Sequence, residues 1–125
     1  MGEFAPAATT TPEIMIAHVG QVTSRVRLGA GGVMLPNHSS LKVAESYRLL
    51  EALHPGRIDL GIGRAPGTDQ LTAVALRRSR SAPLADDFLT QLAELSGFGD
   101  GTLPAGHPFA KVRAMPDDVS LPPIW

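Results

Sequence analysis

Apolar residues recur along the chain at two spacings, one typical of amphipathic helices and the other of buried strands. Apolar positions every three or four residues predict a helix over 11–23, opened by Thr11 as N-cap and Pro12 at the first helical position. Residues 26–35 (VRLGAGGVML) are almost uncharged and, after Arg27, apolar or glycine at every position. Such a run predicts a strand that is covered on both faces, as in a parallel sheet.

The next two elements complete a strand-helix-strand unit. Helical spacing of apolar residues predicts a helix over 41–53, with Ser39 or Ser40 as its N-cap, and His-Pro-Gly at 54–56 ends it. The apolar run IDLGIG at 58–63 predicts a second short strand. Because the connection is too long for a hairpin, the two strands should be parallel neighbours joined by a right-handed β-α-β crossover. The fold class is therefore α/β.

Beyond the second strand, the pattern predicts two further helices and then loses its periodicity. One helix covers 71–78, and another runs from Asp86, as its cap, to Leu95. A Pro/Gly-rich loop at 96–123 follows, with room for one short strand, and the apolar PPIW at the end begins another element. Residues 1–10 are expected to be disordered or to derive from a cloning vector, which leaves 11–125 as the folded segment.

Composition excludes several classes of function. The chain has 125 residues, 43% hydrophobic and 18% charged, which is typical of one soluble globular domain. A net charge of -1 gives no electrostatic case for a nucleic acid or membrane partner, and no apolar run approaches the roughly 20 residues of a membrane span. Cysteine is absent and the four histidines lack metal-ligand spacing, so no metal site is expected. A cytoplasmic location is the default expectation.

Glycines after the second predicted strand invite comparison with two phosphate-binding motifs. Gly61, Gly63 and Gly67 give G-x-G-x-x-x-G, one residue longer than the dinucleotide fingerprint. Pro66 also disfavours helical geometry at Ala65, where the helix of that motif begins. No Gly-Lys-Ser/Thr follows, so a P-loop is excluded as well.

Two interpretations of this glycine segment remain. Gly63 and Arg64 follow a parallel strand at its carboxyl end, where ligands bind and where arginine can hold a phosphate through two hydrogen bonds. Alternatively, the glycines only allow close packing and Arg64 pairs with Asp59 or Asp69. Further glycines within residues 29–32 (GAGG) favour the first interpretation, because two neighbouring strands ending in glycine make a flat backbone floor for a planar ligand.

The segments VRLGAGGVMLPNHSSLKVAE and LEALHPGRIDLGIGRAPGTDQ closely resemble the bacterial luciferase-like flavin monooxygenases, near the alkanal monooxygenases. The resemblance runs from about Thr11 to Trp125. It implies part of a TIM-type (β/α)₈ barrel that binds reduced FMN, or a deazaflavin as in some relatives. A separate reductase would supply the reduced flavin, and dioxygen would oxidise an aldehyde or similar small organic substrate.

The resemblance also implies roles for particular residues. Gly31 and Gly32 fall on the family's non-proline cis peptide, against which the flavin ring packs, and Gly63 and Arg64 fall where the family contacts the flavin and its phosphate. The chain is expected to begin inside the barrel's second helix and to stop as the fifth strand begins at 123–125. No catalytic residue is therefore carried over, and we expect the chain to be inactive alone.

Two further expectations concern the histidines and the assembly. His38 is the histidine nearest the ligand end of a strand and is the candidate for lining a substrate cavity, whereas His54 should make helix-end contacts. The alternative to a flavin enzyme is a truncated, non-catalytic half-barrel module stabilised by self-association or by a partner subunit. The strand at 26–35 would then be an exposed apolar edge, so a homo-oligomer is expected.

Overall fold

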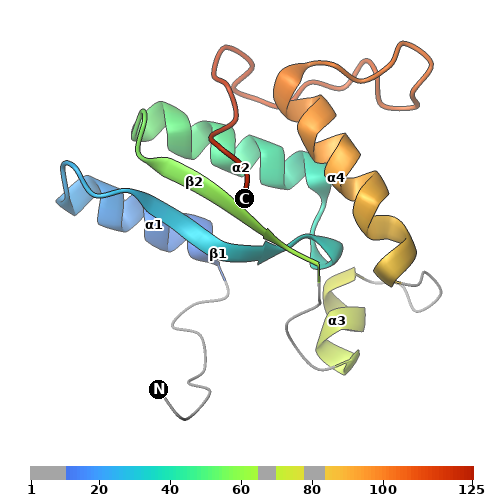
Figure 1. The fold of residues 1–125 in the computed structure, drawn as a ribbon, viewed down its shortest axis with the longest axis horizontal. Coiled ribbons are helices and arrows are strands. Elements are labelled where there is room, and N and C mark those ends of the chain that lie inside the picture. The colour runs from blue at the N-terminus through green and yellow to red at the C-terminus, as the bar shows by residue number, and fades with distance from the viewer. Residues whose placement is uncertain (1–10, 65–69, 78–83) are drawn as a thin grey trace.

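The computed structural model describes residues 11–64, 70–77 and 84–125, which form two parallel strands and four α-helices (Figure 1). In chain order the elements are α1 (Pro12–Val22), β1 (Leu28–Met34), the 3₁₀ helix η1 (Leu35–Asn37), α2 (Ser40–Leu53), β2 (Ile58–Gly63), α3 (Gln70–Arg77) and α4 (Leu84–Asp100). The order strand, helix, strand confirms the predicted α/β arrangement.

The two strands pair in parallel, as predicted, with Leu28 opposite Ile58 and an irregularity in the register between Ala30 and Val33. The C-terminal segment adds a short third strand on the other side of β2. There the Leu60 amide donates to the Pro123 carbonyl and the Trp125 amide donates to the Leu60 carbonyl, both over 2.9 Å. The expectation that a further strand begins at 123–125 is therefore confirmed.

Helices α1 and α2 pack against one face of this sheet (Figure 1). Side chains of β2 alternate accordingly, since Ile58 and Leu60 are fully buried against the helices while Asp59 lies on the opposite, open face. On β1, Gly29 and Gly31 are exposed. The prediction that this strand is covered on both faces is thus wrong for the described residues. Its second face carries glycines and not large apolar side chains that a covering layer could pack against.

The ends of α2 follow the predicted signals. Ser39, not Ser40, is the N-cap, and its hydroxyl accepts a hydrogen bond from the Lys42 amide. Ser40 instead donates to the Gln91 carbonyl over 3.0 Å and so ties α2 to α4. Gly56 has a φ of 75°, the left-handed conformation expected of glycine after a helix end.

Helix α4 is longer than predicted, since it begins before Asp86 and continues beyond Leu95 to Asp100. Leu95 and Phe98 are buried in the core, one helical turn apart. Gly97 and Gly99, which suggested a loop, lie within the helix. They leave room for the segment that follows it, because a Cβ at either position would collide with a leucine side chain of that segment.

The strand predicted over 26–35 is shorter in the structure, where it covers Leu28–Met34.

Arg48 fastens the segment after α4 to the rest of the fold. Its side chain is buried on α2, and its guanidinium donates to the carbonyl oxygens of Ala114, Pro116 and Gly99. One buried cation thus joins α2, the end of α4 and a loop distant in sequence.

Candidate functional site

Beyond the middle of β1, at the irregularity in its pairing with β2, lies the Gly31–Gly32 peptide, which is cis as the family resemblance implied. A Cβ on Gly32 would lie 2.9 Å from the backbone of Gly61, so the strands approach too closely there for a side chain. A Cβ on Gly31 would meet nothing within 4 Å. The Gly31 backbone therefore faces open space, as a floor for a flat ligand requires.

Gly63 ends β2 opposite Met34 of β1. The thioether of Met34 occupies the space that a Cβ on Gly63 would need. This glycine accordingly makes room for a protein side chain, and a ligand would meet it through backbone atoms. The polarizable thioether stands beside the carboxyl ends of both strands.

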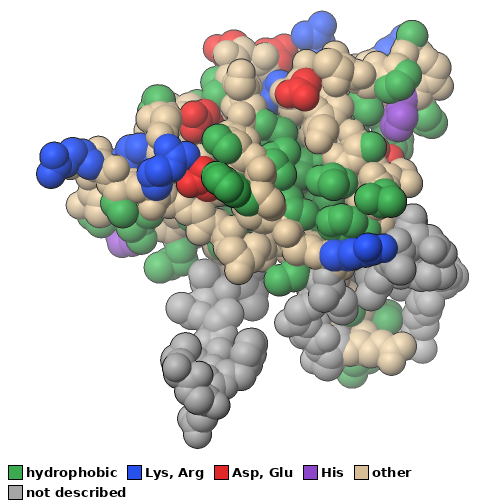
Figure 2. Space-filling view, viewed as in Figure 1, with side chains coloured by type: hydrophobic (Ala, Val, Ile, Leu, Met, Phe, Trp, Pro, Cys, Tyr) green, Lys and Arg blue, Asp and Glu red, His purple; other side chains and the backbone are tan. Residues whose placement is uncertain are grey.

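Arg64 follows β2 directly and is exposed, with its guanidinium carbon 5.5 Å from the centre of the Phe88 ring on α4. Asp59, one of the two partners considered for Arg64, lies near the opposite end of β2 and pairs with Arg27 instead. Asp69 lies outside the described residues. On the side of the molecule that Figure 2 shows, hydrophobic side chains gather between the C-terminal segment and α4.

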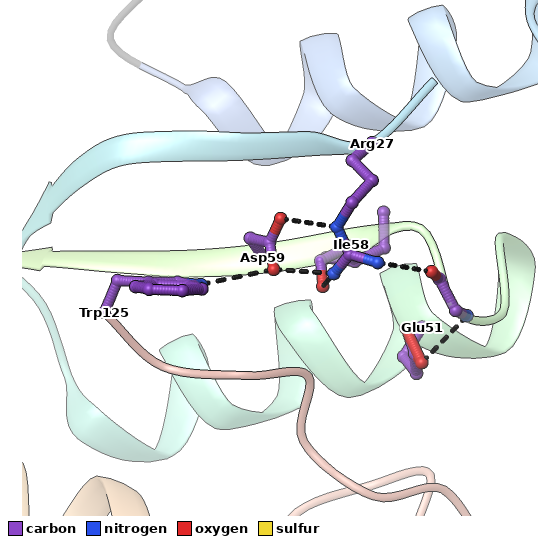
Figure 3. A network of polar contacts seen from close by, with 6 residues as sticks. Arg27, Glu51, Ile58, Asp59 and Trp125 are labelled. Atoms are coloured by element: carbon purple, nitrogen blue, oxygen red, sulfur yellow. Dashed lines mark hydrogen bonds and ion pairs between the residues drawn. The ribbon is translucent and has the colours of Figure 1, made fainter. Parts of the chain in front are cut away.

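The amino ends of the strands carry a polar network that sequence analysis did not anticipate (Figure 3). Arg27 donates to both carboxylate oxygens of Asp59, at 2.7 and 3.0 Å, and Trp125 donates its indole N–H to the same carboxylate over 3.2 Å. The hydrogen bond from Arg27 holds the pKa of Asp59 below its usual value. No local pattern signals this pair, because it depends on the strand register, in which Asp59 lies opposite Gly29, two residues after Arg27.

The histidines take separate structural positions. His54 is the C-cap residue of α2, which fits the expected helix-end role. Its buried ring also packs on α1, against Gly20 and with Nε2 3.2 Å from the Ala17 carbonyl, which was not predicted. His107 lies 3.9 Å from Glu94. Within the described part of the chain, no three His, Cys, Asp or Glu side chains are grouped so as to hold a metal ion.

His38 is exposed and lines a pocket of about 520 Å³ between η1, α3 and α4. Its other lining residues are Pro36, Asn37, Ser39, Leu76, Thr90, Gln91 and Glu94. None of these belongs to the glycine floor of Gly31 and Gly32, so the structure does not bring His38 and that floor into one cavity.

Among the described helices, none is long and apolar enough to cross a membrane.

Comparison with known proteins identifies relatives of this chain. Residues 3–125 match the profile of the family described as luciferase-like monooxygenase. An Escherichia coli K12 protein named luciferase-like monooxygenase is 45% identical over all of the chain, which covers 35% of that protein. The uncharacterized protein YvbT of Bacillus subtilis is 49% identical over 94% of the chain and 34% of its own length.

Among solved structures, the crystal structure of apo-MsnO8 matches with a TM-score of 0.78 and 41% identity, over 94% of the chain and 34% of that protein. The chain therefore spans about a third of the length of these relatives, and its strands and helices form part of a TIM-type (β/α)₈ barrel. With a matching family profile over almost the whole sequence, the chain belongs to the luciferase-like monooxygenase family.

Proposed function

We propose that this chain contributes the flavin-contacting strands of an FMN-dependent monooxygenase that uses dioxygen to oxidise an aldehyde or similar small organic substrate. The observation that carries the proposal is the open backbone at Gly31, in the middle of β1, together with Arg64 just beyond the carboxyl end of β2. In barrels of this type, ligands bind at the carboxyl ends of the strands. Family membership supports the oxidative chemistry.

The described residues suit the two chemically distinct parts of FMN. Its isoalloxazine ring is flat, and Gly31 presents backbone with no side chain and nothing within 4 Å of a Cβ position. Its phosphate is a dianion, and Arg64 presents a guanidinium just beyond β2. When bound, reduced FMN would supply the electrons with which dioxygen is activated.

The role of this chain in such a reaction is binding and orientation. Gly31 and Gly32 let the ring lie against the sheet, while the backbone of Gly63 lies beside it. Arg64 holds the phosphate by charge-assisted hydrogen bonds, which fixes how the ring is presented. The hydrophobic side chains between the C-terminal segment and α4 (Figure 2) would restrict water near the ring. No proton-transfer step is assigned to a residue of this chain.

The direct test is equilibrium titration of the chain with oxidised and then reduced FMN, with a deazaflavin as competitor to decide between the two cofactors. The informative variant is Gly31→Leu, which places a side chain on the open floor. Gly106→Leu is the matched control, because a Cβ there also meets nothing within 4 Å. We expect at least about tenfold weaker FMN binding by Gly31→Leu alone, which corresponds to about 1.4 kcal/mol.

Thermal unfolding of the same samples separates loss of binding from loss of fold. A folded wild-type chain that binds neither reduced nor oxidised FMN would contradict the proposal. So would a folded Gly31→Leu variant with unchanged affinity.

The second candidate function, a non-catalytic half-barrel module, is favoured by the exposed edges of the sheet. Among the described strands, β1 pairs on one side only, and Trp125 at the end of the third strand is 79% exposed. Such surfaces favour pairing with a second copy or a partner subunit. Light scattering at micromolar concentration tests this, since a stable monomer would argue against self-association.

A further inference from the structure

Arg64 and Phe88 come from elements far apart in sequence but meet at one end of the sheet. Arg64 follows β2, whereas Phe88 lies in the first turns of α4, and the guanidinium carbon is 5.5 Å from the ring centre. Phe88 is half-buried and packs against the hydrophobic core. The ring is therefore held in place by the fold, while the arginine above it is exposed.

A fixed aromatic ring can order an arginine without competing for its hydrogen bonds. The negative face of the ring attracts the cation, and the planar guanidinium can lie over it. All five N–H donors of a guanidinium lie in its plane, so a ring below that plane does not occupy them. Ordering the side chain before the ligand arrives reduces the entropy lost on binding.

We infer that Phe88 is a positioning residue for Arg64, which it holds over its ring so that the guanidinium edge faces the phosphate of the flavin. The inference rests on the proposed function, and it assigns α4 a part in the phosphate site. Phe88 itself need not touch the cofactor. Its effect should consequently appear only with ligands that carry a phosphate.

Riboflavin provides the comparison, because it has the ring system of FMN without the phosphate. FMN and riboflavin are titrated against the full chain and against Arg64→Ala, Phe88→Leu, Phe88→Tyr and Leu89→Ala, with a thermal melt of each protein. Leu89 is the neighbouring control, since its side chain is 67% exposed on the same helix. The measured quantity is the preference for FMN, the ratio of the two dissociation constants.

We expect Arg64→Ala to abolish most of the FMN preference and Phe88→Leu to reduce it by about two- to fivefold, the range for an exposed cation–π contact. Phe88→Leu should leave riboflavin affinity within about twofold, an energy difference close to the measurement error. Phe88→Tyr keeps an aromatic face and should retain the preference, as should Leu89→Ala.

Each other result overturns a defined part of the argument. If Arg64→Ala removes the preference and Phe88→Leu does not, the positioning role is wrong while the proposed function stands. Equal losses of FMN and riboflavin affinity in Phe88→Leu would mean that Phe88 acts through packing alone, which also overturns the inference. If the folded wild-type chain shows no preference, or Arg64→Ala leaves it unchanged, the phosphate assignment fails and the inference fails with it.

Discussion

The guanidinium of Arg27 holds both carboxylate oxygens of Asp59, with Nη2 2.7 Å from Oδ1 and Nε 3.0 Å from Oδ2 (Figure 3). Arg27 immediately precedes β1, Asp59 lies on β2, and Trp125 of the third strand donates to the same carboxylate. The ion pair therefore links β1 and β2 at their amino ends, and the hydrogen bond from Trp125 adds the C-terminal segment to it. Arg64 stands at the other end of β2, so the stabilising network and the proposed ligand site are separated along the strand, as is usual in barrels.

Replacing Asp59 by asparagine should change the acid dependence of stability. The pKa of Asp59 is lower in the fold than its usual 3.8, first because Arg27 donates to it and then because Trp125 does. The pair therefore stabilises the fold fully above that value and loses its contribution as the pH falls below about 4. Urea unfolding should show wild type more stable than Asp59→Asn near neutral pH, with the difference shrinking in acid.

Asp117→Asn is the control for that experiment, because Asp117 pairs with Arg113 at the exposed surface. Its stability should follow wild type closely at neutral pH. A difference between Asp59→Asn and wild type that stays constant down to about pH 2 would show that the carboxylate charge is not responsible.

Arg48 should be far more important for stability than an exposed arginine. It is 6% exposed and donates to three backbone carbonyls, whereas Arg113 is 77% exposed at its side chain. Arg48→Met leaves those carbonyls without their donor and should destabilise the fold by roughly 2–4 kcal/mol. Arg113→Met should change stability by less than about 0.5 kcal/mol. Denaturant unfolding of both variants checks this, and equal effects would refute it.

Tyr47 is the single tyrosine of the chain, so its titration can be followed alone by ultraviolet absorbance. Burial raises the pKa of its phenol above the usual 10.0, with a smaller contribution from the charge of Glu13. Because the pKa is higher in the folded chain, the stability that depends on the neutral phenol should be fully present below about pH 10. It should be lost as the pH rises further. Phenolate absorbance near pH 10.0 in a chain that is still folded would contradict this.

Removing the hydroxyl tests the same residue at neutral pH. The Tyr47 oxygen is buried and has no hydrogen-bond partner among the described residues. Tyr47→Phe should therefore be more stable than wild type by about 1 kcal/mol and should lack the decline in alkaline solution. Loss of stability in this variant would indicate that the hydroxyl is hydrogen-bonded in solution.

Features that depend on nearby residues were predictable from the sequence. The strand at 58–63, the helix start near Ser39 and the turn at Gly56 each follow from residue types within a few positions. Parallel pairing followed from the length of the connection between the strands. The family resemblance contributed the cis peptide at Gly31–Gly32, which residue spacing alone did not predict.

Features that depend on distant packing were not predictable in the same way. The extension of α4 past Leu95 requires the later leucines that pack where Gly97 and Gly99 have no side chain. The position of Arg64 over the Phe88 ring depends on where α4 lies relative to β2, and no local pattern specifies it. Likewise, Arg48 reads as an ordinary helical arginine until its carbonyl partners are known. In each case the residue type is compatible with both an exposed and a buried position, so the sequence alone does not decide between them.

The last prediction concerns Gly61, which lies where the two strands approach each other closely. A Cβ at this position would overlap the carbonyl oxygen of Ala30 on β1, and backbone atoms cannot move aside as a flexible side chain can. Gly61→Ala should therefore force the strands apart and destabilise the fold by about 1–3 kcal/mol. Gly106→Ala meets open space and should stay within about 0.5 kcal/mol of wild type. Denaturant unfolding measures both, and a neutral Gly61→Ala would mean that β1 and β2 lie farther apart than described.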